Sequence, residues 1–142
     1  ARRSQALARR QAVSDVLVDT SVWIDFFRGD PQAIVRLDPL LRDDRAAVSG
    51  PIVAEVTSGA RTPAIFQQLR ARLGALTMLE PPLDVWERVA AARFSLSRHG
   101  TQAHMVDLLI AMTASTAGHA LLTRDRDFTG IARVVPLDVE LF

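Results

Sequence analysis

The sequence predicts an α/β domain built on a parallel β-sheet, and two observations support this prediction. Short apolar runs, such as residues 15–19 and 120–123, lack the polar alternation of half-exposed strands, which is typical of strands buried on both faces. Segments with helical spacing of apolar residues separate these runs along the chain. The chain has 142 residues, of which 49% are hydrophobic, so we expect one domain with a sizeable core.

The first strand is expected over residues 15–19 and leads directly into a helix. Thr20 or Ser21 is expected to cap the start of this helix, and Gly29 is expected to end it. Ligands of open α/β sheets bind beyond the carboxyl ends of the strands. Asp19 therefore stands where a ligand or a reacting group is expected.

The remaining elements follow from the same patterns. Pro51 favours the first turn of a helix, and Gly118 is expected to close the apolar helix that precedes it. The expected helices cover residues 20–28, 31–44, 52–61, 63–73, 83–98 and 106–117. The further strands are expected over residues 46–49, 76–79, 120–123 and 134–137, with a short helical turn between the last two.

The composition excludes several classes of chemistry. All 17 basic residues are arginine, so mechanisms that require a lysine, including P-loop phosphate binding, Schiff-base chemistry and phospho-aspartate transfer, are excluded. The absence of cysteine excludes disulfides and zinc ligation by thiolates. No apolar run has the length of a membrane span, and no secretory signal is present, so we expect a cytoplasmic protein without a membrane contact.

Positive charge is concentrated at the N-terminus. Residues 1–13 contain four arginines and no acid, and we expect them to form a basic tail separate from a domain over residues 14–142. Acids outnumber arginines in the remainder of the chain. The charge balance therefore gives no strong indication of nucleic-acid binding over the body of the domain.

Several acidic residues lie beside apolar segments, where solvated charges are not expected. Asp107 shares a predicted helix face with Ile110, Ala111 and Ala114. Asp19 and Asp125 follow predicted strands, and Glu55 lies on a predicted close-packed helix face of small residues. The four candidates are Asp19, Glu55, Asp107 and Asp125.

Each candidate also has an ordinary alternative. Asp19 and Asp107 are at positions typical of helix caps, Asp125 is at a position typical of a turn, and Glu55 is a surface residue if its helix is rotated. A cluster of all four would raise the pKa of its members unless a cation compensates. Oxygen ligands without histidine or cysteine suit Mg²⁺ or Mn²⁺. Asp25, one turn into the first helix, is expected to be exposed or paired with a cation.

Four segments together resemble the PIN-domain ribonucleases, and more narrowly the VapC toxins of VapBC toxin–antitoxin pairs. These segments are residues 18–25, 51–59, 107–114 and 122–128, in the order and at about the spacing of that family. The resemblance covers roughly residues 15–138. It implies a three-layer α/β/α fold with a parallel sheet of about five strands, and Mg²⁺- or Mn²⁺-dependent endonuclease activity on RNA.

The resemblance also implies roles for individual residues. The implied catalytic acids are Asp19, Glu55, Asp107 and Asp125. Asp19 and Asp107 are the expected direct metal ligands, Glu55 and Asp125 bind directly or through water, and Asp127 is an alternative to Asp125. Thr20 and Thr123 are expected to support the site. The arginines expected to steer RNA are Arg28, Arg93, Arg98, Arg124 and Arg126.

The implied partners are a cognate VapB-type antitoxin, an RNA of the tRNA or rRNA class, and a second copy of the chain in a homodimer. Two other functions are compatible with the same residues. One is a metal-dependent DNA nuclease or phosphatase that uses the same acids. The other is a PIN module that binds RNA or protein without catalysis.

Overall fold

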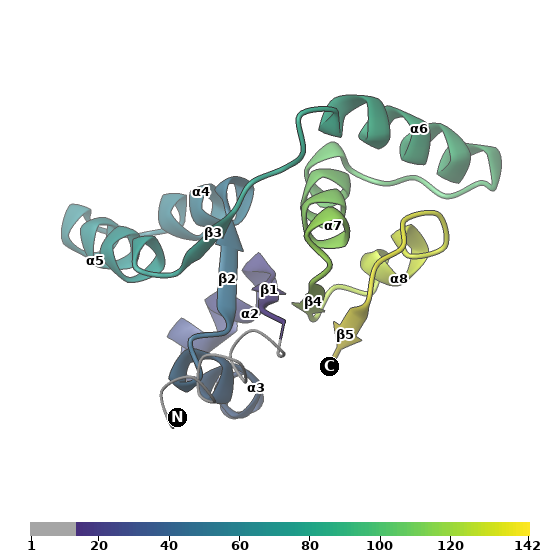
Figure 1. Cartoon of the computed structure of the whole chain (residues 1–142). Coiled ribbons are helices and arrows are strands. Elements are labelled where there is room, and N and C mark those ends of the chain that lie inside the picture. Colours follow the sequence, from purple (N-terminus) through teal and green to yellow (C-terminus); the bar gives the residue numbers. More distant parts are fainter. Residues whose placement is uncertain (1–13) are drawn as a thin grey trace, which may run out of the picture.

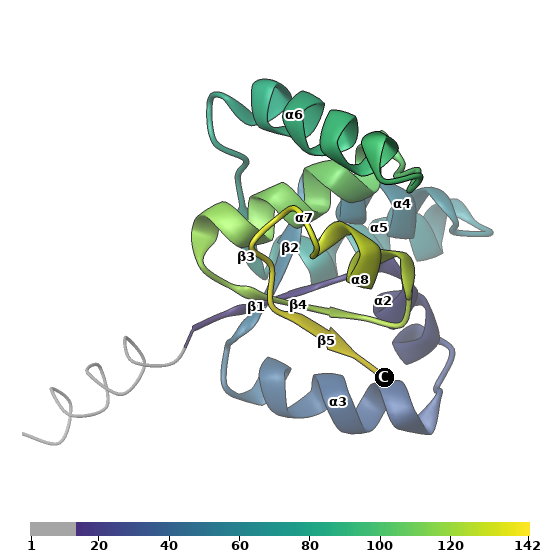
Figure 2. The ribbon, with the colours of Figure 1, turned by 90° about the vertical axis from the view of Figure 1, so that its right-hand side faces the viewer.

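The computed structural model describes residues 14–142 and has three layers (Figures 1 and 2). A five-stranded parallel sheet forms the middle layer, with the strand order β3-β2-β1-β4-β5. The prediction of a parallel sheet with about five strands is therefore confirmed. The strands are β1 (Val16–Val18), β2 (Ala46–Ser49), β3 (Thr77–Leu79), β4 (Ala120–Thr123) and β5 (Val139–Leu141). The expected tail over residues 1–13 lies outside the described residues.

Helices cover both faces of the sheet. Figure 2 shows α3 below the sheet and α7 above it, with α6 packed on the outer side of α7. The predicted α/β/α layering is thus confirmed. None of the helices in residues 14–142 has the length and apolar character required to cross a membrane. The helices are α2 (Thr20–Phe27), α3 (Pro31–Arg42), α4 (Gly50–Ser58), α5 (Pro63–Gly74), α6 (Val85–Arg98), α7 (Met105–Ala117) and α8 (Asp127–Ile131).

The central strand β1 lies at the switch point of the strand order, between β2 and β4. All three of its residues are buried, as expected for a strand covered on both faces. It pairs with β2 on one side and with β4 on the other, and Val18 lies opposite Leu122. The backbone N–H of Asp19 continues this ladder by donating to the carbonyl of Leu122 at 2.9 Å. Asp19 therefore follows β1 directly, beside the carboxyl end of β4, where such sheets bind ligands.

Helix α2 is anchored to the end of β1 by an aromatic residue. The Trp23 side chain is 1% exposed, and its Nε1–H donates to the Val18 carbonyl at 3.0 Å. The Trp23 ring also stacks on Phe27, with ring centroids 5.9 Å apart. A buried indole needs such a hydrogen bond, because an unpaired N–H in the core costs about 1–3 kcal/mol. The bond fixes the start of α2 relative to Asp19.

The prediction of a last strand over residues 134–137 is wrong. The N–H groups of Val134 and Val135 instead bond back to the carbonyl of Ile131, in the turn that ends α8. Pro136 follows this turn and has no N–H to give to a strand ladder. The fifth strand begins only at Val139, where the chain reaches β4.

The predicted N-cap of the first helix is also wrong, although the helix ends before Gly29 as predicted. Asp19 occupies the cap position of α2, and its side chain makes no capping hydrogen bond. Thr20 and Ser21 lie inside the first turn instead. Gly29 has a φ of 81° immediately after the C-cap residue Arg28, a left-handed conformation that glycine adopts without strain.

Candidate metal centre

Three carboxylates from α7, α8 and the loop between β4 and α8 meet beyond the carboxyl end of β4. Asp107 projects from the first turn of α7, Asp125 lies in the loop after β4, and Asp127 begins α8. One oxygen of each lies within 4.8 Å of the others. Within residues 14–142, this is the group of carboxylates close enough to share a metal ion. The structure thus brings both Asp125 and Asp127, the two alternatives from the sequence, close to Asp107.

Asp107 shows the electrostatic cost of this arrangement. Its pKa is raised from 3.8 to about 6, first by burial and then by the negative charges of Asp125 and Asp19. The charge of Glu55 raises the pKa further, whereas His104 lowers it. The face that Asp107 shares with its helix neighbours is buried, as predicted. Uncompensated carboxylates at this distance favour the binding of a cation.

Asp19 is oriented by hydroxyl groups. The residue is 6% exposed, and its Oδ2 accepts hydrogen bonds from Ser21 Oγ and Thr123 Oγ1, both at 2.9 Å. No side chain among residues 14–142 donates to its Oδ1. The absence of a capping bond argues against the interpretation of Asp19 as a helix cap. One carboxylate oxygen is therefore held in place while the other remains available to a ligand.

The same two hydroxyls also bind the loop after β4. Thr123 Oγ1 accepts from the backbone N–H of Asp125 at 3.0 Å, and Ser21 Oγ accepts from the N–H of Arg124 at 3.2 Å. Each hydroxyl thus links the loop backbone to the carboxylate of Asp19. From the sequence alone, Ser21 is predicted only as a helix cap. Its position two residues after a strand-end aspartate was the available signal for this role.

Glu55 lies on the rim of the site. The predicted close-packed environment is wrong, because Ile52, Val56 and Thr57 form the buried face of α4 and Glu55 is exposed. Thr20 Oγ1 donates to Glu55 Oε1 at 3.2 Å, which ties the first turn of α2 to this carboxylate. The charge of Glu55 still reaches Asp107 and raises its pKa.

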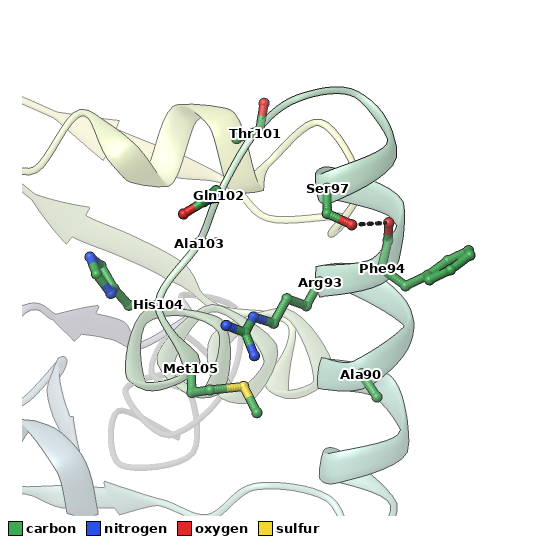
Figure 3. A pocket seen from close by; sticks show the side chains of 9 residues that line it. All are labelled: Ala90, Arg93, Phe94, Ser97, Thr101, Gln102, Ala103, His104 and Met105. Carbon is green, nitrogen blue, oxygen red and sulfur yellow. Dashed lines mark hydrogen bonds between the residues drawn. The ribbon is translucent and has the colours of Figure 1, made fainter.

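The arginines expected to steer RNA differ in their surroundings. Arg28, Arg93, Arg98 and Arg126 are exposed. Figure 3 shows Arg93 extending from α6 toward the segment with His104 and Met105, across a cavity of about 590 Å³. This cavity borders the start of α7, the helix that carries Asp107. Arg124, in contrast, is held by carboxylates of the protein itself, since it pairs with Asp25 and Asp30.

The donor set fits a hard divalent cation. The cluster offers carboxylate oxygens alone, which are the ligands of Mg²⁺, Mn²⁺ and Ca²⁺, whereas zinc and copper favour nitrogen and sulfur. Burial and then the charges of Asp125 and Asp19 raise the pKa of Asp107, and a bound cation would favour its ionised form. The acidic cluster is therefore consistent with a metal site.

Comparison with known proteins identifies the family. Residues 16–134 match the model of the PIN domain. The chain belongs to the PIN-domain family. Within it, the chain is a VapC homologue, because it is 32% identical over 132 residues to ribonuclease VapC11 of Mycobacterium tuberculosis, covering 89% of this chain and 98% of the relative. The predicted resemblance to the VapC ribonuclease toxins is thus confirmed.

Solved structures agree with this family assignment. A toxin–antitoxin complex from Klebsiella pneumoniae contains a chain that is 29% identical to this PIN domain, with a TM-score of 0.69, and the match covers 87% of this chain and 99% of that one. VapBC2 from Rickettsia felis gives a TM-score of 0.72 at 21% identity, over 89% and 97% of the two chains. The second likeness confirms the fold alone.

Proposed function

We propose that this PIN domain is a metal-dependent endoribonuclease that hydrolyses phosphodiester bonds of RNA with Mg²⁺ or Mn²⁺. The observation that carries the proposal is the meeting of Asp107, Asp125 and Asp127 within 4.8 Å, together with the oriented carboxylate of Asp19, whose charge raises the pKa of Asp107. The ribonuclease name of the mycobacterial relative supports RNA as the substrate over DNA or a phosphomonoester. The composition of the cluster supports a hard cation as the cofactor.

The proposed roles of the acids differ according to their positions. Asp107, Asp125 and Asp127 would hold the ion, with the free Oδ1 of Asp19 as a further ligand. A bound divalent ion supplies positive charge to the scissile phosphate and lowers the pKa of a water molecule. Ser21 and Thr123 keep the Asp19 carboxylate in one orientation. Glu55, which is exposed at the rim and accepts a hydrogen bond from Thr20, would act through water.

The metal requirement can be tested directly. We expect the purified protein to cleave RNA in Mg²⁺ or Mn²⁺ and to lose this activity in EDTA. Asp125→Asn should lower cleavage by more than about a hundredfold, which corresponds to about 3 kcal/mol of transition-state stabilisation. Glu80→Gln is a suitable control, because Glu80 is an exposed acid between β3 and α6. Equal cleavage in excess EDTA would refute the proposal. Equal cleavage of single-stranded DNA of the same sequence would favour the DNA nuclease instead.

A protein antitoxin is the partner that the relatives support. The Klebsiella structure is a complex of a toxin with its antitoxin. We propose that a cognate VapB-type antitoxin inhibits this chain by covering the acids, with an arginine placed against their uncompensated charge. The proposed RNA substrate, of the tRNA or rRNA class, rests on the family resemblance. The proposed homodimer is supported by exposed apolar residues on α6 and at the start of α7, namely Trp86, Phe94, Met105 and Val106.

A further inference from the structure

Arg124 lies between Thr123 and Asp125, yet its side chain is committed to other parts of the fold. Its Nη1 donates to Asp25 Oδ2 at 2.9 Å and to Asp30 Oδ2 at 2.6 Å. Its Nη2 donates to Gln32 Oε1 at 2.6 Å, and its guanidinium carbon lies 4.7 Å from the ring centroid of Phe142. One side chain thus connects the loop after β4 to α2, to the start of α3 and to the C-terminal residue.

The partners of Arg124 are well suited to hold it. Asp30 is the N-cap of α3, and its Oδ2 also accepts from the backbone N–H of Ala33, so the carboxylate is itself fixed. The bond to Ala33 and then the bonds from Arg124 lower the pKa of Asp30, which keeps it charged. A planar guanidinium offers several donors in a fixed geometry and can serve three acceptors at once, which a lysine cannot do as well.

The backbone of the same loop is bonded to the site. The Arg124 N–H donates to Ser21 Oγ, and the next N–H, of Asp125, donates to Thr123 Oγ1. Asp125 in turn accepts from the N–H of Asp127 through its Oδ1 at 2.9 Å. Any shift of the loop therefore moves Asp125 and Asp127 relative to Asp107 on α7.

We infer that Arg124 is a positioning residue for the metal site: by fixing the loop after β4 to α2 and α3, it holds Asp125 and Asp127 at the distance from Asp107 that a cation requires. This inference rests on the metal site proposed above. It replaces the expectation that Arg124 steers RNA, because three of the five N–H donors of its guanidinium are used within the protein.

The affinity for Mn²⁺ distinguishes positioning from simple charge. Removal of a cation next to an acidic cluster should tighten Mn²⁺ binding by electrostatics alone. If Arg124 positions the loop, Arg124→Ala should instead weaken binding, by about tenfold or more, as the loss of outer-shell partners does in metal proteins. Mn²⁺ dissociation constants of the full chain are measured by electron paramagnetic resonance below the melting temperature of each variant. Arg124→Lys, which keeps the charge but cannot serve all three acceptors, should bind with intermediate affinity.

Arg36→Ala is the matched control. Arg36 lies over the same Phe142 ring, at 5.2 Å from its centroid, and pairs with Glu140 on β5 at 3.9 Å, and neither interaction involves the loop after β4. We expect it to leave the Mn²⁺ affinity unchanged even if it lowers the melting temperature. If Arg124→Ala fails to fold, Arg124→Lys against wild type decides the question.

Each outcome has a clear meaning. Unchanged or tighter Mn²⁺ binding by Arg124→Ala, or by Arg124→Lys where the alanine variant is unfolded, overturns the inference while leaving the metal site intact. No Mn²⁺ binding by the wild-type protein overturns the metal site and the inference together.

A second measurement is RNA binding in EDTA as a function of salt. A slope reduced by about one in Arg124→Ala would show a direct phosphate contact and overturn the inference, whereas an unchanged slope supports it.

Discussion

At the scale of the residue, the site is built from hydroxyls and carboxylates, and the effect of His104 on the pKa of Asp107 is outweighed by burial and the neighbouring acids. Thr123 and Ser21 orient Asp19 through neutral hydrogen bonds, so they leave its negative charge uncompensated. Arg124, the adjacent cation, is paired instead with Asp25 and Asp30. The consequence appears at Asp107, whose pKa is raised to about 6.

Asp107→Asn should therefore stabilise the metal-free protein in a pH-dependent way. Because the pKa of Asp107 is higher in the folded chain than its ordinary value of 3.8, ionisation costs stability as the pH rises from about 4 to about 6. A rise of this size corresponds to about 3 kcal/mol, and the partial solvent exposure of the carboxyl reduces the expected effect to about 1 kcal/mol. The asparagine variant removes this cost, so it should melt about 2–4 °C higher at pH 8 in EDTA.

The difference between the two proteins should become small near pH 4, where Asp107 is protonated in the folded chain and about half protonated in the unfolded chain. Thermal melts at pH 4 and pH 8 test this, with Glu80→Gln as an exposed-acid control. A gain of the same size at both pH values would mean that the effect is not electrostatic. With added Mg²⁺ the order should reverse at pH 8, because the ion stabilises only the protein that binds it.

At the scale of the element, two electrostatic effects oppose each other at the start of α7. The start of a helix favours a carboxylate, and an acid in the first turn gains about 0.3–1 kcal/mol from the helix dipole. Asp107 occupies this position in α7, yet its pKa is raised rather than lowered. Burial and the neighbouring acids therefore outweigh the dipole. Helix α7 therefore holds Asp107 rigidly in place although burial and the neighbouring acids favour the protonated form of this carboxyl.

Two of the helix ends that contain glycine, those of α7 and α5, should respond oppositely to alanine. Gly118 follows α7 with a φ of 72°, and an added Cβ meets no atom within 4 Å, so backbone strain alone should make Gly118→Ala destabilising by about 1 kcal/mol. Gly74 is the last residue of α5, without a positive φ and with open space around it. Gly74→Ala should stabilise by about 0.5–1 kcal/mol. Urea denaturation measures both, and effects of the same sign would contradict the assigned backbone conformations.

At the scale of the whole molecule, the topology concentrates the chemistry at one edge of the sheet. The strand order places β1 and β4 side by side, with β2 and β5 outside them, so the chain diverges at their carboxyl ends. Asp19 follows β1 and Asp125 follows β4 at this point. Helix α7, which lies above the sheet in Figure 2, carries Asp107 in its first turn, and the charges of Asp125 and Asp19 reach this residue and raise its pKa. Three separate parts of the chain thus bring acids to one region, in which Asp19 lies close enough to the acidic cluster to raise the pKa of Asp107.

Deletion of residues 1–13 should leave this arrangement intact. The sheet, its covering helices and the acids all lie within residues 14–142, and Ser14, whose carbonyl accepts from Arg45 at 3.1 Å, is retained. We expect a change of at most about 0.5 kcal/mol, or about 2 °C, in thermal melts and an unchanged Mn²⁺ affinity. If the four arginines of the segment bind RNA, the salt dependence of RNA binding should become shallower. Loss of folding would show that the domain begins before residue 14.

The local patterns of the sequence determined the parallel sheet, Asp19 at a strand end, and Asp107 on an apolar helix face. These predictions succeed because burial on one or both faces is written into the spacing of apolar residues. Local pattern was insufficient for the last strand, since the apolar residues 134 and 135 close a turn and pairing with β4 begins only at Val139. The exposure of Glu55 depends on the rotation of α4, which its neighbours decide.

The tertiary structure alone decided which oxygens meet and what Arg124 does. The sequence left Asp125 and Asp127 as alternatives, and the loop after β4 brings both to Asp107. Arg124 pairs with carboxylates 99 and 94 residues earlier in the chain. Contacts at such separations leave no periodic signal in the sequence, because they depend on strand register and on the direction of single side chains. The residue types of the site are thus readable from the sequence, whereas their distances and partners follow from the packing of α2, α3 and α7 around the sheet.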